Sequence, residues 1–190
     1  MRFFLSASLA LLMTTAWLGS TLQRLPGGQK LDPVVFEAIN PPGLQFVINP
    51  GKTVRRHQPE TMIAGIALFD YDNDGLLDVY LVSGASMPGL EKNDPSYFNR
   101  LFRHMPDGSF RDVTDTAGIR GHGYTLGVAA GDYDNDGFED LFVAGLRKNI
   151  LYHNNGDGTF TDVTVKAGLA KPDPQYGLSL IHISEPTRPY

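Results

Sequence analysis

Two short acidic stretches of this chain carry the same pattern of carboxylates. Residues 70–78 (DYDNDGLLD) and residues 132–140 (DYDNDGFED) both have aspartate at positions one, three, five and nine and glycine at position six. Four carboxylates this close together repel one another unless a cation lies among them. Hard oxygen ligands on a short loop are typical of Ca²⁺ sites, so the pattern predicts about one calcium ion per loop.

The predicted ligands are the four aspartates of each loop and the backbone carbonyl at position seven, with water completing the coordination. They are Asp70, Asp72, Asp74, Leu76 and Asp78 in the first loop, and Asp132, Asp134, Asp136, Phe138 and Asp140 in the second. The glycine at position six allows the sharp bend that such a loop needs. The alternative is a solvated turn, because Asp, Asn and Gly favour turns without any metal. Two copies with the same offsets favour the metal site.

The residues after each loop distinguish it from an EF-hand loop. An EF-hand carries a bidentate glutamate at position twelve and lies between two helices. Position twelve is Leu81 in the first copy and Val143 in the second, each within an apolar, β-prone run. Each acidic loop is therefore expected to join two strands.

The chain repeats itself around these loops, with 62 residues from Asp70 to Asp132 and 50 from Asp107 to Asp157. The difference falls within residues 83–99 of the first unit, which we expect to be a surface loop. Four short strands are predicted in each unit: 63–68, 77–82, 100–104 and 109–113, then 127–130, 140–144, 149–153 and 159–163. The last two strands of each unit flank an Asp-Gly turn, a strong hairpin signal. Four strands per repeat predict the blades of an all-β propeller.

Other candidate chemistry is sparse. His104 and His153 are interpreted as equivalent third-strand positions, and no histidines have the spacing of a metal site. His122, between two glycines, could line a site at the mouth of a propeller, although a plain loop is the simpler interpretation. The sequence has no serine elbow, phosphate-binding loop or redox cysteine pair, so we expect no catalytic residues and no cofactor besides calcium.

The amino-acid composition favours a β protein and argues against a nucleic-acid-binding protein. The 190 residues include 21 glycines and 13 prolines with 19% charged residues, as in a turn-rich β protein. The net charge of −5 argues against a nucleic-acid partner. There is no cysteine, so stability must come from the core, from metal or from both.

The two ends of the chain are expected to lie outside the repeats, which we place at residues 34–177. Residues 1–20 resemble a secretory signal peptide, with an uncleaved anchor as the alternative, and residues 21–33 resemble a linker. The signal predicts a secreted, periplasmic or cell-surface protein without a membrane span in the mature chain. Residues 178–190 resemble a translated sequencing adapter and are expected to be an artefact.

The two acidic loops, each between a small apolar strand and a second β-prone run, resemble FG-GAP/VCBS repeats of the integrin-α-type β-propeller superfamily. The Asp-Val-Thr-x-x-Ala-Gly segments at 112–118 and 162–168 are similar to those of the cartilage acidic protein/ASPIC–UnbV group. The resemblance covers about residues 36–177. It implies a calcium-bound propeller, usually of seven blades and often followed by an ASPIC–UnbV domain. This chain would supply about two to two and a half of those blades.

This resemblance leads us to expect a non-enzymatic binding or cell-adhesion module with an extracellular protein or glycan as partner. Two alternatives stay open. The chain could be part of an exported enzyme whose active site lies in further blades or in a further domain. It could also belong to a carbohydrate-binding propeller, although no aromatic and polar sugar pocket is visible in the sequence.

Overall fold

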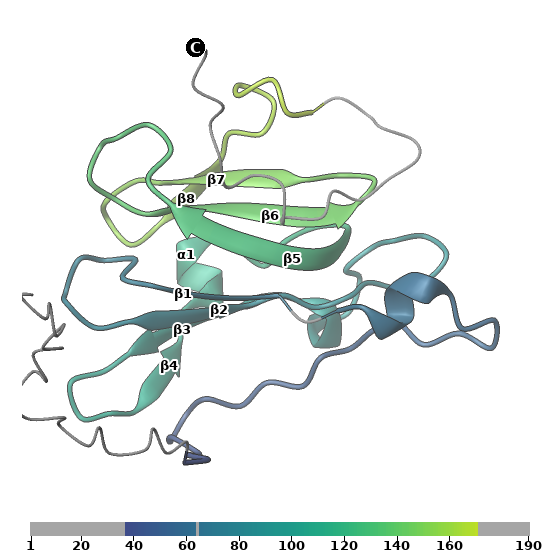
Figure 1. Cartoon of the computed structure of the whole chain (residues 1–190), viewed down its shortest axis with the longest axis horizontal. Helices are drawn as coiled ribbons and strands as arrows, with labels where there is room; N and C mark the ends of the chain where they lie inside the picture. The colour runs from purple at the N-terminus through teal and green to yellow at the C-terminus, as the bar shows by residue number, and fades with distance from the viewer. Residues whose placement is uncertain (1–36, 64, 171–190) are drawn as a thin grey trace, which may run out of the picture. The chain divides into compact units, whose positions relative to one another are not determined.

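The computed structural model describes residues 37–63 and 65–170 (Figure 1). The predicted signal peptide (1–20), linker (21–33) and adapter-like tail (178–190) lie outside the described residues. Nearly all of the described chain belongs to one compact unit that begins at Ile39. No helix within the described ranges is long and apolar enough to cross a membrane.

Two four-stranded sheets make up the fold, and every pair of neighbouring strands is antiparallel. The first sheet has the order β1 (Ile66–Phe69), β2 (Asp78–Leu81), β3 (Arg100–His104), β4 (Phe110–Asp112), and the second the order β5 (Tyr124–Gly131), β6 (Asp140–Leu146), β7 (Ile150–Asn154), β8 (Phe160–Asp162). Helical segments in the described residues are η1 (Gln58–Thr61), η2 (Pro95–Tyr97) and α1 (Thr114–Ala117). The predicted all-β fold of four-stranded antiparallel blades is confirmed.

The strand boundaries differ most from prediction in the first strand of each unit. β5 begins at Tyr124, three residues before the predicted start, whereas β1 begins at Ile66, three residues after it. Tyr124 pairs with Leu146, and a register shift between Thr125 and Gly127 lets the longer strand continue along β6. Tertiary pairing therefore extends one first strand and shortens the other.

The two sheets stack against each other, with β1 next to β5 (Figure 1). Aromatic side chains and glycines form the contact between them. The Phe160 ring on β8 lies 6.4 Å from the Phe69 ring on β1 and 6.3 Å from the Tyr71 ring just after β1. At Gly65, a side chain would not fit, because a Cβ there would lie 2.7 Å from the Cα of Gly127. The glycines directly before β1 and within β5 thus let the sheets approach closely.

The segment 83–99 between β2 and β3 is only partly the surface loop that the sequence suggested. Lys92 Nζ donates to the carbonyls of Ser83 and Gly84 at 2.7 Å and of Tyr97 at 2.5 Å. Asn99 at its end is fully buried and accepts hydrogen bonds from the Ser83 amide and the Thr125 hydroxyl. The expectation of a plain surface loop was wrong for the ends of this segment, because buried polar groups fix both of them.

Candidate metal centre

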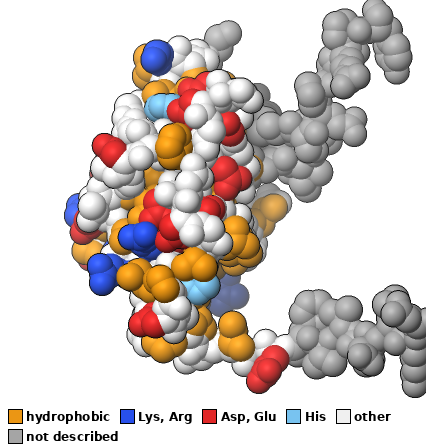
Figure 2. All heavy atoms as spheres, turned by 90° about the vertical axis from the view of Figure 1, so that its left-hand side faces the viewer, with side chains coloured by type: hydrophobic (Ala, Val, Ile, Leu, Met, Phe, Trp, Pro, Cys, Tyr) orange, Lys and Arg blue, Asp and Glu red, His pale blue; other side chains and the backbone are white. Residues whose placement is uncertain are grey.

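The two acidic loops lie side by side at one end of the sheets. The first loop connects β1 to β2, and the second connects β5 to β6. The Asn73 amide group donates to the Gly137 carbonyl at 3.1 Å, and the Asp70 N–H donates to the Glu139 carboxylate at 3.2 Å. Figure 2 looks onto the left-hand side of Figure 1 and shows acidic side chains gathered there. Two loops whose first aspartates are 62 positions apart in the sequence thus share one acidic surface.

Backbone amides wrap the aspartates of the first loop. The Asp70 carboxylate accepts from the N–H groups of Asp74 at 3.0 Å and Gly75 at 2.8 Å. The Asp78 carboxylate accepts from the Tyr71 N–H at 3.1 Å and from the His104 N–H of β3 at 2.7 Å. The aspartates at positions one and nine are therefore held in place by the loop and by the neighbouring strand.

The second loop repeats this hydrogen-bonding pattern. The Asp132 carboxylate accepts from the N–H groups of Asp136 at 3.1 Å and Gly137 at 3.0 Å. The Asp140 carboxylate accepts from the Tyr133 N–H at 3.0 Å and the Asn154 N–H at 2.7 Å. The same sequence pattern has therefore produced the same backbone conformation twice.

The glycine at position six is needed for its backbone conformation. Gly75 has φ 86° and Gly137 has φ 94°. A Cβ at either residue would meet no atom within 4 Å, so lack of space does not explain the glycine. The left-handed conformation does, because side chains with a Cβ rarely adopt it.

Carboxylate oxygens converge in both loops, though not all four in one group. Oxygens of Asp70, Asp72 and Asp78 lie within 4.8 Å of one another in the first loop. In the second loop the same holds for Asp132, Asp134 and Asp136, and for Asp134, Asp140 and a ring nitrogen of His153. Asp74 is absent from the first group. The roles of the Leu76 and Phe138 carbonyls as ligands stay predictions.

Unsatisfied buried polar atoms gather at these loops. In the described part of the chain, three buried side-chain atoms lack a hydrogen-bond partner: Asp72 Oδ1, Arg103 Nε and His153 Nδ1. Buried polar atoms are nearly always paired, and an ion is one explanation when they are not. An unpaired carboxylate oxygen and a ring nitrogen without a partner are donors that suit a cation, so the residues present fit a metal ion.

Sequence reasoning missed Arg103 and His153 as parts of the site. Val79 pairs with Phe102 and Leu141 pairs with Tyr152, which places Arg103 of β3 level with His153 of β7. The interpretation of His104 and His153 as equivalent was therefore wrong by one residue, since His104 corresponds to Asn154. The repeat alignment of LFRH at 101–104 with LYHN at 151–154 already pairs Arg103 with His153, but it does not show that both side chains face the acidic loops.

Burial makes the charges of the first loop costly. Desolvation raises the pKa of Asp78 to about 6, although its two backbone hydrogen bonds act in the opposite direction. Burial also raises the pKa of Asp72, and the nearby Arg103 guanidinium offsets only part of this effect. The pKa of Asp74 is lowered, mainly by the Leu76 N–H and then by Arg103. A cation near Asp72 and Asp78 would compensate the cost of burying them.

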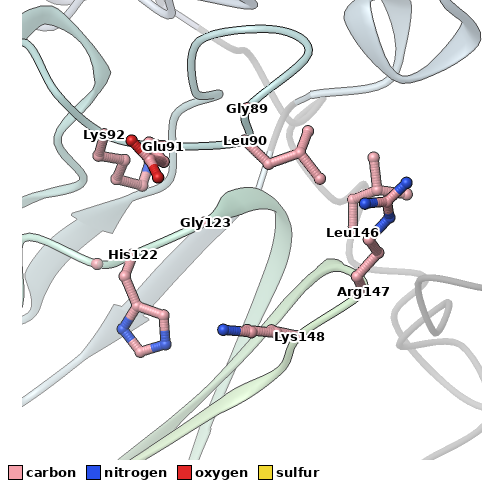
Figure 3. Close-up of a pocket in the computed structure, with 10 residues that line it drawn as sticks. Gly89, Leu90, Glu91, Lys92, His122, Gly123, Leu146, Arg147 and Lys148 are labelled. Carbon is pink, nitrogen blue, oxygen red and sulfur yellow. The ribbon is translucent and has the colours of Figure 1, made fainter. Parts of the chain in front are cut away.

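A separate pocket of about 420 Å³ lies where the segment 83–99 approaches the β6–β7 turn (Figure 3). His122 lines it together with Lys92, Arg147 and Lys148, and the side chains of His122 and Lys148 point toward each other in Figure 3. His122 thus lines a pocket, and a ligand there stays a prediction.

A profile of FG-GAP-like repeats matches residues 70–143 and 132–180, and both matches begin at the first aspartate of an acidic loop. The chain is also similar to Cartilage acidic protein 1 from Homo sapiens, with 35% identity over 65 residues. That alignment covers 34% of this chain and 10% of the human protein, so it spans about a tenth of that relative. The repeat matches together cover more than half of the chain, and the chain therefore belongs to the family of FG-GAP-like repeat proteins.

Proposed function

We propose that this FG-GAP repeat segment, a β-propeller-type binding module, holds one calcium ion in each acidic loop as a structural cross-link. The observation that supports this most is the position of two unpaired buried atoms that can donate an electron pair, Asp72 Oδ1 at the first loop and His153 Nδ1 at the second. A solvated turn does not explain them, because exposed carboxylates and nitrogens would pair with water.

In this proposal the cation joins the strands on either side of each loop. Asp70 lies at the end of β1 and Asp78 begins β2, so an ion held by both connects neighbouring strands. The ion would also relieve repulsion among the carboxylates. The gain in stability then grows with the logarithm of the free calcium concentration above the Kd. Because a hydrogen bond between Asn73 and Gly137 links the loops, an ion that holds one loop in its folded conformation also stabilises the other.

Calcium titration by calorimetry, with thermal unfolding in calcium and in chelator, tests this proposal. At a calcium concentration about 100 times the Kd, we expect a gain of about 2.7 kcal/mol per site. Asp72→Asn and Asp134→Asn, at aspartates that belong to the converging groups, should each remove most of the gain at one loop. Asp107→Asn, at a hairpin turn outside the loops, is the control, since asparagine can accept the same hydrogen bond from Ser109. The same melting temperature in calcium and chelator, without heat of binding, would refute the proposal.

We further propose that the module acts outside the cytoplasm as a non-enzymatic binding or adhesion protein for an extracellular protein or glycan. The support is the membership of a propeller-type repeat family together with the signal-like residues 1–20. A reporter enzyme fused after residue 20 should be exported, and the calcium-loaded chain should bind a glycan array or a cell surface. A reporter that stays in the cytoplasm would contradict the proposed location.

A further inference from the structure

Arg103 and His153 occupy the same position in the two blades, one residue before the end of β3 and of β7. The loops that they face have the same aspartates and the same backbone hydrogen bonds. Comparing the two loops within the chain therefore shows how the facing side chain, arginine or histidine, changes the surroundings of the aspartates. The inference drawn from it rests on the proposed metal binding.

In the first loop, the positively charged Arg103 guanidinium lies against two of the aspartates that would bind a cation. Its Nη2 atom lies 2.7 Å from Asp72 Oδ2 and 2.9 Å from Asp74 Oδ2. This contact turns Asp74 toward the guanidinium, and Asp74 is the predicted ligand missing from the converging group of Asp70, Asp72 and Asp78. A divalent ion in this loop must share its carboxylates with a fixed positive charge, which weakens binding.

In the second loop, His153 offers a ligand atom. Its Nδ1 atom lies 3.3 Å from Asp140 Oδ1 and 3.4 Å from Asp134 Oδ2, and it has no hydrogen-bond partner. The edge-to-face contact with Tyr133, at 6.1 Å and 85°, fixes the ring in this orientation. When Nδ1 carries no proton, this nitrogen and the two carboxylate oxygens are three electron-pair donors around one point.

The total charge also differs between the loops. Position eight is Leu77 in the first loop and Glu139 in the second. The Glu139 carboxylate accepts from the Asp70 N–H of the first loop, however, so it adds no ligand to the second. Among the described residues, an arginine pairs with the aspartates of the first loop only. The charge of Arg103 and the ligand set therefore favour the second loop.

We propose that the second loop, with Asp134, Asp140 and His153, is the tighter site and accepts a borderline divalent transition ion such as Zn²⁺, whereas the first loop is a weaker, oxygen-only site. Imidazole nitrogen is a ligand that zinc and similar ions prefer, whereas calcium prefers oxygen. The pair of loops then differs in both affinity and metal preference because of one side chain in each blade.

Zinc and calcium titrations of the whole chain test this assignment. His153→Gln keeps an oxygen ligand, so zinc affinity should fall about tenfold or more while calcium affinity changes little. Arg103→His should add a second zinc site, raising the zinc stoichiometry from one to two. His104→Gln is the matched control, because it removes an imidazole that stacks on Phe110 outside the loop.

A measurement on the unmodified chain makes the test independent of any variant's folding. Zinc should shift the NMR resonance of His153 Nδ1 and leave the nitrogens of His104 in place. If zinc affinity is unchanged in His153→Gln and the Nδ1 resonance does not move, the assignment is overturned, even when calcium binds normally. Absence of calcium binding by every form would instead refute the proposed function.

Discussion

Single polar side chains hold the two acidic loops in position. Asn154 is fully buried, and its amide group donates to the Tyr71 carbonyl at 2.8 Å and to the Glu139 carbonyl at 3.1 Å. One side chain therefore connects the first loop to the second. The equivalent residue of the first blade is His104, which stacks on Phe110 and has no such bridging role in the described structure.

Asn154→Ala should lower the free energy of unfolding by about 2 kcal/mol, because two buried carbonyls would lose their donor. Urea unfolding of the chelated protein measures this effect. His104→Ala is the control and should cost less, since its ring is partly exposed. If both variants lowered the free energy of unfolding equally, the hydrogen bonds of Asn154 between the loops would not contribute to stability.

Asp78 gives the first loop a pH dependence with a defined sign. Its pKa is raised from 3.8 to about 6, so the metal-free fold binds an extra proton between these values. The resulting stabilisation is complete below the unfolded value of about 4 and is lost as the pH rises through 6. Calcium needs the ionised form, so its affinity should change in the opposite direction.

Calcium affinity at the first loop should therefore weaken as pH falls, by about tenfold per pH unit below 6, since one proton competes with the ion. The measurement is a titration between pH 7.5 and pH 5 in Asp134→Asn, which removes the aspartate shared by both converging groups of the second loop and so isolates the first. In chelator, this group should instead make the fold more stable at pH 5 than at pH 7. A calcium affinity independent of pH over this range would contradict the protonation of Asp78.

At the scale of elements, the segment 83–99 depends on one lysine. Burial lowers the pKa of Lys92 to about 7, yet its ammonium group donates to three carbonyls. No carboxylate forms an ion pair with Lys92 among the described residues. The ammonium group thus acts as the centre around which this loop folds.

Lys92→Met should leave those three carbonyls without their donor and cost about 2 kcal/mol. The loop should also open locally, so limited proteolysis should cut faster within residues 86–98. Lys148→Met, at an exposed position lining the same pocket, should change neither quantity. Unchanged cleavage of Lys92→Met would show that the loop is held by its other contacts.

At the scale of the molecule, stability depends on how closely the two sheets stack. One face of β1 buries Ala67 and Phe69, whereas Ile66 and Leu68 on the alternate positions are 59% and 62% exposed. In a propeller both faces of a blade are covered by neighbouring blades. The exposed side chains of β1 are therefore where a further blade would pack.

Gly65→Ala should separate the sheets, because the added Cβ would lie 2.6 Å from a Val82 methyl group and 2.7 Å from Gly127 Cα. Overpacking of this kind costs about 1–3 kcal/mol, which urea unfolding would detect. Gly131→Ala at the end of β5 is the control, since its Cβ would meet no atom within 4 Å. A loss no larger than that of the control would mean that the sheets adjust freely.

The sequence by itself determined the four-stranded blade and the conformation of the acidic loop. Alternating apolar runs, Asp-Gly turns and the repeated acidic pattern are local signals, and each gives the same backbone wherever it occurs. This is why the predicted strands and the glycine conformations at 75 and 137 agree with the structure. Tertiary structure decided which side chains contact the loops and the segment 83–99. The contacts of Arg103, His153, Lys92 and Asn154 depend on strand register and sheet stacking, which bring together residues distant in sequence and which no local pattern encodes.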